Sequence, residues 1–179
     1  FHISAVPSFT GAGRVCVRVH GRHVGDSPIS IQVVDGPPPP KLYAIGGRFL
    51  NVVERYDLTT EQWTTMSPMP TAHGGLGVCV IDGQLYAVGG YGPNIGTVER
   101  YDPETDRWTT LKPMPTARGM LGVCALDGLL YAVGGYPEMN VIERYDLRSD
   151  TWTTLKPMPT ACFGVSAFSL DGLLYAVGG

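Results

Sequence analysis

The sequence predicts an all-β fold in which short antiparallel sheets repeat along the chain, and three observations lead to this prediction. LYAIGG at 42–47 returns three times as LYAVGG, and successive starts are separated by 43, 45 and 44 residues. ERYD occurs three times, and each copy is followed by a tryptophan and then by MPTA. Asp-Gly pairs lie between apolar runs in the later copies. One shared period for all these motifs indicates repeated structural units.

Each unit is expected to contain four short strands. In the second unit the four segments are GGLGVCVI (74–81), QLYAVGG (84–90), TVERYD (97–102) and RWTTL (107–111). The turn between the first two is Asp82-Gly83, a dipeptide typical of type I′ hairpins because both central residues need positive φ. QLYAVGG is apolar on both alternating faces, which is typical of a strand covered on both sides. Prolines after the tryptophan strand end the unit.

Four short strands covered on both faces describe one blade of a β-propeller. A single blade cannot bury its own faces, so the blades must stack around an axis. We expect the glycines of the first strand near that axis and the Tyr and Trp side chains, such as Tyr101 and Trp108, in the wider outer region. The first unit starts at LYAIGG and is expected to lack its innermost strand. The count is then 13 strands, or about three blades, which predicts an open arc and an incomplete propeller.

The GG doublet, the Tyr followed by a Trp and the period near 45 residues together resemble the kelch repeat. GVCVIDGQLYAVGGYGPNIGTVERYDPETDRWTTL is similar to sequences of the kelch-like family, and the resemblance covers residues 42–179. In that family BTB and BACK domains usually precede a six-bladed propeller, and one rim of the propeller receives a protein partner. The resemblance therefore implies a cytoplasmic interaction module that recruits substrates to a ubiquitin ligase or binds actin and the cytoskeleton.

Residues 1–36 contain none of the repeat motifs. GRVCVRV (13–19) and SPISIQVV (27–34) alternate between apolar and polar residues and predict a β-hairpin. The segment resembles the C-terminal part of a filamin-type immunoglobulin repeat. The proline-rich residues 37–41 then predict a stiff linker between two domains, with a ligand for proline-recognition domains as the alternative.

Charge and composition exclude some classes of partner. The net charge is −3, and no basic patch suggests nucleic acid or an anionic membrane surface. No apolar run approaches the roughly 20 residues of a membrane-spanning helix. Cys79 and Cys124 lie in matching contexts of successive repeats, so we expect small buried side chains and reduced thiols, which suit a cytoplasmic protein.

No residue pattern points to catalysis, a metal or a cofactor. The chain has four histidines, and His20 and His23 lie in the connection of the predicted hairpin, where surface positions are expected. We interpret the recurring Glu54, Glu99 and Glu143 as exposed charge pairs at the blade edges. A propeller enzyme of the galactose-oxidase type is the alternative from another class, and it would need metal ligands that break the repeat.

The segments that differ between repeats predict a binding surface. A loop of variable length follows each GG, and one variable residue follows each MPTA. In a four-stranded antiparallel blade these positions share one rim, and loops varied on a constant scaffold are typical of binding sites. The predicted partner-binding residues are Arg48, Asn51, His73, Tyr91, Asn94, Arg118, Tyr136, Glu138, Asn140 and Cys162. The resemblance implies an Arg facing acidic peptides at the position of His73, Arg118 and Cys162, and we expect Arg118 to offer its guanidinium to a partner's carboxylate.

Overall fold

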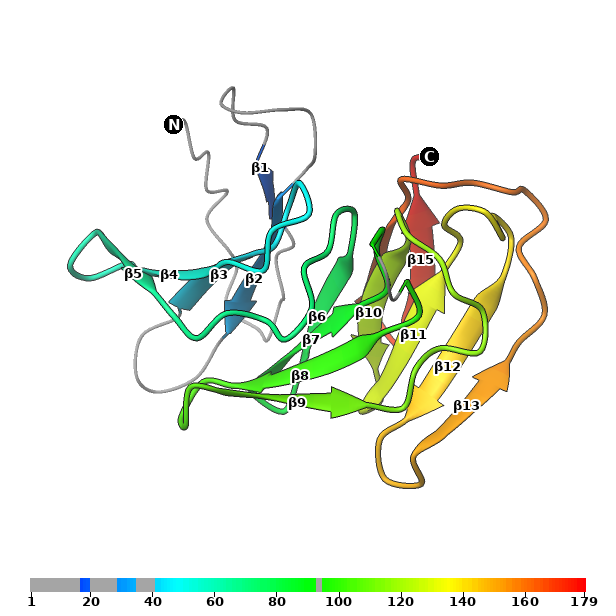
Figure 1. The fold of residues 1–179 in the computed structure, drawn as a ribbon. Helices are drawn as coiled ribbons and strands as arrows, with labels where there is room; N and C mark the ends of the chain where they lie inside the picture. Colours follow the sequence, from blue (N-terminus) through cyan, green and yellow to red (C-terminus); the bar gives the residue numbers. More distant parts are fainter. Residues whose placement is uncertain (1–16, 20–28, 35–40, 93–94) are drawn as a thin grey trace.

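The computed structural model describes residues 17–19, 29–34, 41–92 and 95–179. These residues form fifteen strands in four antiparallel sheets, and they contain no helix (Figure 1). The prediction of an all-β fold is therefore confirmed. No helix in this part of the chain is available to cross a membrane.

The first sheet contains five strands, whereas the sequence predicted three for the first unit. They are β1 (Val17–Val19), β2 (Ile29–Val34), β3 (Lys41–Ile45), β4 (Val53–Asp57) and β5 (Gln62–Thr65), in that order across the sheet. β1 and β2 pair as the expected antiparallel strands, but β2 also pairs with β3. Its register places Ser30 opposite Ile45, as Gly77 lies opposite Val88 in the next sheet. The expectation that the first sheet lacks its inner strand is thus wrong, because β2 occupies that position.

The assignment of residues 1–36 to a filamin-type repeat stays a prediction. Residues 1–16, 20–28 and 35–40 lie outside the described ones, and these ranges include both histidines of the predicted hairpin connection and the prolines of the predicted linker at 37–41. Lys41, the last residue of that predicted linker, is the first residue of β3.

The second and third sheets are the predicted four-stranded units. The second contains β6 (Gly77–Ile81), β7 (Gln84–Val88), β8 (Val98–Asp102) and β9 (Arg107–Leu111), and the third contains β10 (Gly122–Leu126), β11 (Leu129–Val133), β12 (Ile142–Asp146) and β13 (Thr151–Thr154). β14 (Ser166–Leu170) and β15 (Leu173–Val177) form the fourth sheet. Asp82 and Gly83 have φ values of 50° and 77°, as the predicted turn type requires.

The sheets pack face to face in chain order, and their inner strands are crowded. Tyr43 and Ile45 of the first sheet pack against Leu85 of the second, and the second packs against the third in the same way. A Cβ atom added to Gly77 would lie 2.2 Å from Val123 Cγ2, and one added to Gly122 would lie 2.8 Å from Ala167 Cβ. Glycine at these positions lets adjacent inner strands approach closely, as the sequence predicted.

The outer strands are tied to the preceding sheet through the repeated aromatic residues. Tyr101 and Trp108 pack with their ring centroids 5.0 Å apart. The Trp108 indole donates a hydrogen bond of 2.9 Å to the carbonyl of Ser67, at the end of the first sheet. Trp152 repeats this bond to Lys112 at 3.1 Å. The predicted Tyr–Trp packing is confirmed, and the indole N–H adds a link between neighbouring sheets.

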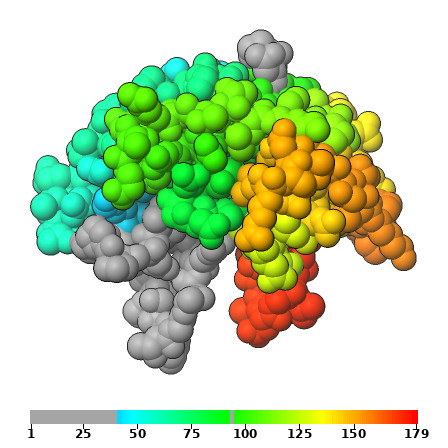
Figure 2. Space-filling model, turned by 90° about the horizontal axis from the view of Figure 1, so that it is seen from below, coloured from blue at the N-terminus to red at the C-terminus, as the bar shows by residue number. Residues whose placement is uncertain are grey.

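The four sheets follow one another in an arc. Figure 2 shows the chain colours running in order across one face of the molecule, from cyan in the first sheet to orange in the third. Among the described residues, no ladder joins the fourth sheet to the first. The arrangement is consistent with part of a β-propeller.

Candidate partner-binding rim

The variable loops and the links between sheets meet at one end of the sheets. Isolated bridges join Leu50 to His73 and Gly74 to Tyr91, so the β3–β4 loop, the first link and the β7–β8 loop are neighbours. Gly119 forms the same bridge to Tyr136 one repeat later. We call this end the rim: residues 46–52, 72–75, 89–97, 117–120, 134–141 and 161–164, of which 93–94 lie outside the described residues.

The predicted site residues divide by exposure. Arg48, Tyr136, Glu138 and Asn140 are exposed, Asn51, Tyr91 and Cys162 are partly buried, His73 and Arg118 are buried, and Asn94 lies outside the described residues. The Asn51 amide donates a hydrogen bond of 3.1 Å to the carbonyl of Met69, which holds the β3–β4 loop against the end of the first sheet. The rim thus brings these residues to one region, but only some of them face solvent.

Arg118 is fully buried, which contradicts the expectation that its guanidinium faces a partner. Its exposed fraction is 0%, and so is that of Glu143, whose Oε2 lies 3.3 Å from Arg118 Nη2. The same nitrogen donates a hydrogen bond of 3.0 Å to the carbonyl of Ala132. Thr116 donates to the other carboxylate oxygen at 2.8 Å. Burial lowers the pKa of Arg118, and the Glu143 and Glu138 carboxylates oppose that shift.

His73 and Glu99 repeat this arrangement one sheet earlier. His73 Nε2 lies 3.7 Å from Glu99 Oε2, and Thr71 donates a hydrogen bond of 2.7 Å to Glu99 Oε1. The exposed fractions of His73 and Glu99 are 2% and 0%. The interpretation of the recurring glutamates as exposed edge charges is therefore wrong for Glu99 and Glu143, although Glu54 is exposed.

The link between sheets explains why these glutamates and the variable residues are buried. Each link folds back over the third strand of the following sheet, so its Thr and the variable residue two positions later meet the glutamate of that strand. One feature of the sequence could have indicated this contact: the Thr of MPTA and the Glu of ERYD recur together. A buried carboxylate needs such donors because its desolvation is costly.

Three exposed side chains of the rim are aromatic, and two of them were not among the predicted site residues. Phe49, Tyr136 and Phe163 expose 58%, 51% and 45% of their surface. The rings of Tyr136 and Phe163 lie edge to face, 6.4 Å apart. Burial raises the pKa of Tyr91, and Tyr136 adds a smaller effect in the same direction. Phe49, Tyr91, Tyr136 and Phe163 are here called the aromatic row.

Glycines form the floor beneath this row. A Cβ atom at Gly74 would lie 3.6 Å from Phe49 Cδ1, and one at Gly119 would lie 3.1 Å from Tyr91 Cδ2. Gly119 also exchanges backbone hydrogen bonds of 3.0 and 2.8 Å with Tyr136. The row therefore runs over neighbouring sheets, with Gly74 between Phe49 and Tyr91 and Gly119 between Tyr91 and Tyr136. The sequence pattern did not identify Phe49 and Phe163, because the former lies in a variable loop and the latter takes the place that Gly74 and Gly119 hold in the earlier repeats.

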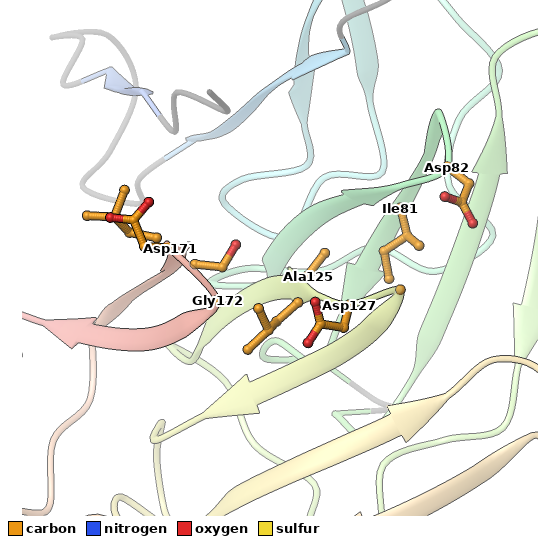
Figure 3. A pocket seen from close by; sticks show the side chains of 10 residues that line it. Ile81, Asp82, Ala125, Asp127, Asp171 and Gly172 are labelled. Atoms are coloured by element: carbon orange, nitrogen blue, oxygen red, sulfur yellow. The ribbon is translucent and has the colours of Figure 1, made fainter. Parts of the chain in front are cut away.

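The opposite end of the sheets carries exposed carboxylates. The Asp-Gly turns of three sheets surround a hollow of about 300 Å³ (Figure 3). Asp82, Asp127 and Asp171 are exposed there. Among the described residues, no group of three or more His, Cys, Asp or Glu side chains is arranged to hold a metal ion.

Comparison with known families decides the identity of the repeats. A family model described as the Kelch motif matches residues 39–70, 72–115 and 117–159. The chain belongs to the kelch-motif family. The three matches cover β3–β5, β6–β9 and β10–β13, so each kelch repeat supplies strands of one sheet, and β2 and the fourth sheet lie outside the matches.

Curated relatives extend this result to kelch-like proteins. Kelch-like protein 26 of Danio rerio is 42% identical over 59 residues, covering 28% of this chain and 10% of the relative. Kelch-like protein 1 of Mus musculus is 48% identical over 44 residues, covering 25% of this kelch chain and 6% of the relative. Kelch-like ECH-associated protein 1A of Danio rerio is 43% identical over 57 residues, covering 27% and 10%. The matched region thus spans a tenth or less of these relatives.

Proposed function

We propose that this kelch chain is a non-catalytic interaction module that binds a protein partner through the rim. The observation that carries the proposal is the aromatic row, in which Phe49, Tyr136 and Phe163 are exposed although most large apolar side chains of the second and third sheets are buried. Exposed aromatic side chains that lie together on a rigid scaffold are typical of protein interfaces. The predicted residues Arg48, Tyr91, Tyr136, Glu138 and Asn140 surround or belong to this row.

The scaffold supports such a role. The sheets hold the ends of every loop: Gly89 and Gly134, for example, donate backbone hydrogen bonds of 2.8 and 2.9 Å to Thr97 and Val141 across their loops. The sheets keep the same sequence from repeat to repeat while the loops change in length and sequence. A constant framework with variable loops at one end can adapt to a partner without loss of the fold.

The role within the cell is proposed from resemblance to the kelch-like family. The chain would recruit substrates to a ubiquitin ligase in the cytoplasm, and an actin or cytoskeletal scaffold is the second candidate. The relatives named above are kelch-like proteins, and the name of one states an association with ECH. These names support a role in association with other proteins.

Paired variants at the two ends of the sheets test this proposal. Tyr136→Ser changes the rim, and Asp127→Asn changes the hollow at the opposite end. A partner is first identified by cross-linking to the chain, then purified and titrated against each variant. We expect Tyr136→Ser to weaken binding and Asp127→Asn to leave it unchanged. The reverse result would place binding at the opposite end and contradict the proposal, and equal weakening by both would contradict a rim-specific site.

A further inference from the structure

We infer that the segment bound by the rim is uncharged and apolar, and that it is not an acidic peptide. The inference rests on the proposed function, because it specifies the chemistry of the partner at that same rim. It departs from what the resemblance implied, which was an Arg at the variable position facing acidic peptides. Three features of the rim carry it: the burial of the basic side chains at its variable position, the exposed aromatic side chains along its row and the balance of its exposed charge.

The basic side chains at the variable position are not available to a ligand. Arg118 and His73 are 0% and 2% exposed, and each lies against a buried glutamate. The guanidinium is fully buried and Glu143 lies 3.3 Å from its Nη2, so a carboxylate of the partner would have to enter the interior and disturb this pair, together with the hydrogen bond that Thr116 makes to Glu143. Separating such a buried pair leaves an uncompensated charge in the protein, which is strongly unfavourable. The rim therefore offers no guanidinium fork at this position.

The exposed charges of the rim cancel. Among its described residues, Arg48 and Glu138 are the exposed charged side chains, and they carry opposite signs. They belong to different repeats, since Arg48 follows the GG of the first and Glu138 follows that of the third. A rim with one charge of each sign gives no net attraction for an acidic segment, and charge complementarity favours a partner segment without net charge.

The aromatic row supplies the contact area instead. Tyr91 lies against Gly119, and Tyr136 pairs with Gly119 through the backbone and contacts Phe163. Aromatic rings offer large contact area at a low cost in side-chain entropy, because two χ angles fix each of them. Flat rings above a glycine floor suit the aliphatic and proline side chains of an extended segment. The residues that decide specificity are therefore Phe49, Tyr91, Tyr136 and Phe163.

A random peptide library tests the inference without assuming a ligand. Twelve-residue peptides are selected by display on the 179-residue chain, and the enriched peptides are synthesised and titrated by calorimetry. Three variants are compared: Tyr136→Ser in the aromatic row, Arg48→Gln to remove the exposed cation, and Asp127→Asn at the opposite end as control. Circular dichroism verifies that each variant keeps its strands.

We expect enriched peptides that are rich in aliphatic or proline residues and carry no net charge. Their affinity should fall about tenfold or more with Tyr136→Ser, as truncation of a central aromatic contact does. It should change less than about twofold with Arg48→Gln and less than about threefold between 50 and 500 mM salt, because exposed charges contribute little.

Two other outcomes separate the inference from the proposed function. Acidic peptides that depend on Arg48 and lose affinity in salt, but still depend on Tyr136, would overturn the inference and leave the rim as the binding site. Peptides that depend on Asp127 and not on Tyr136 would overturn the proposed function as well. If the library yields no peptide whose affinity depends on Tyr136 or Arg48, the inference and the proposed function are both overturned.

Discussion

The buried pair of Arg118 and Glu143 yields the sharpest prediction about stability. Arg118→Ala removes the ion-pair partner of Glu143 and the donor to the Ala132 carbonyl. Glu143 keeps the hydrogen bond from Thr116, but its charge stays at 0% exposure without a cation. Removing one partner of a buried pair costs about 3–5 kcal/mol. A typical domain has a free energy of unfolding of about 5–15 kcal/mol, so the expected loss is a large part of the total.

The assay is guanidinium denaturation of the 179-residue chain followed by far-ultraviolet circular dichroism. The matched control is the double variant Arg118→Met with Glu143→Gln, which removes both charges and keeps similar volumes. Because replacing a whole buried pair is often neutral, we expect the double variant to lose much less than Arg118→Ala. The single variants Arg118→Met and Glu143→Gln complete a double-mutant cycle with this double variant, and the cycle gives the coupling between the two side chains.

One result would refute this reasoning. If Arg118→Ala lowers the free energy of unfolding by less than about 1 kcal/mol, the guanidinium is solvated, because an exposed pair contributes no more than that. The same variant would then be expected to weaken partner binding, as the sequence alone suggested. Loss of stability with unchanged partner affinity supports the buried pair.

Three further predictions follow from the sheets. Gly77→Ala should destabilise the chain by about 1–3 kcal/mol in the same denaturation assay, since its Cβ would overlap Val123. Asp106 accepts hydrogen bonds from the Tyr101 hydroxyl and the Ser67 amide, which hold its pKa below the usual value. Its contribution to stability is therefore present above pH about 4 and is lost as pH falls through the lowered pKa, and Asp106→Asn should flatten that acid limb in thermal melts at pH 2–5. Gln32→Pro removes a backbone donor from β2, which pairs on both sides, so hydrogen exchange should show loss of protection confined to the first sheet, and uniform protection would contradict the role of β2.

The sequence predicted the features that local pattern controls. The Asp-Gly turns adopt positive φ because their residues favour it wherever they occur. The Tyr–Trp pairs form because an antiparallel hairpin places Tyr101 opposite Trp108 once the turn is fixed. Glycine at Gly77 could be placed near the axis from the period alone. These features need no knowledge of distant parts of the chain.

The inner strand of the first sheet could not be predicted in this way. Alternation predicts a strand over residues 27–34, but alternation does not identify the neighbour of a strand. The segment lies outside the repeat, and its pairing with β3 is a contact between two segments of different sequence type. The first kelch repeat contains no strand of its own to pair with the inner edge of β3, and β2 pairs there instead.

The burial of the variable position after MPTA could not be predicted from its variation. Variation between repeats predicts exposure, yet His73 and Arg118 differ and are both buried. What they share is a nitrogen near the glutamate of the next sheet, at 3.7 Å in one pair and 3.3 Å in the other. A buried carboxylate accepts either an imidazole or a guanidinium, so the position can vary without facing solvent.

Neighbouring rim residues therefore differ in role: the buried pairs stabilise the fold, and the exposed aromatic side chains are proposed to bind the partner. The Thr–Glu pairs with His73 or Arg118 join one sheet to the next, while Phe49, Tyr136 and Phe163 of the aromatic row are exposed beside them. Changes at the two sets should therefore have opposite signatures. A substitution in a buried pair lowers the free energy of unfolding and leaves partner affinity intact in the folded fraction, because the paired side chains are 2% exposed or less. A substitution such as Tyr136→Ser lowers affinity with little change in unfolding, because half of that side chain is already exposed to water.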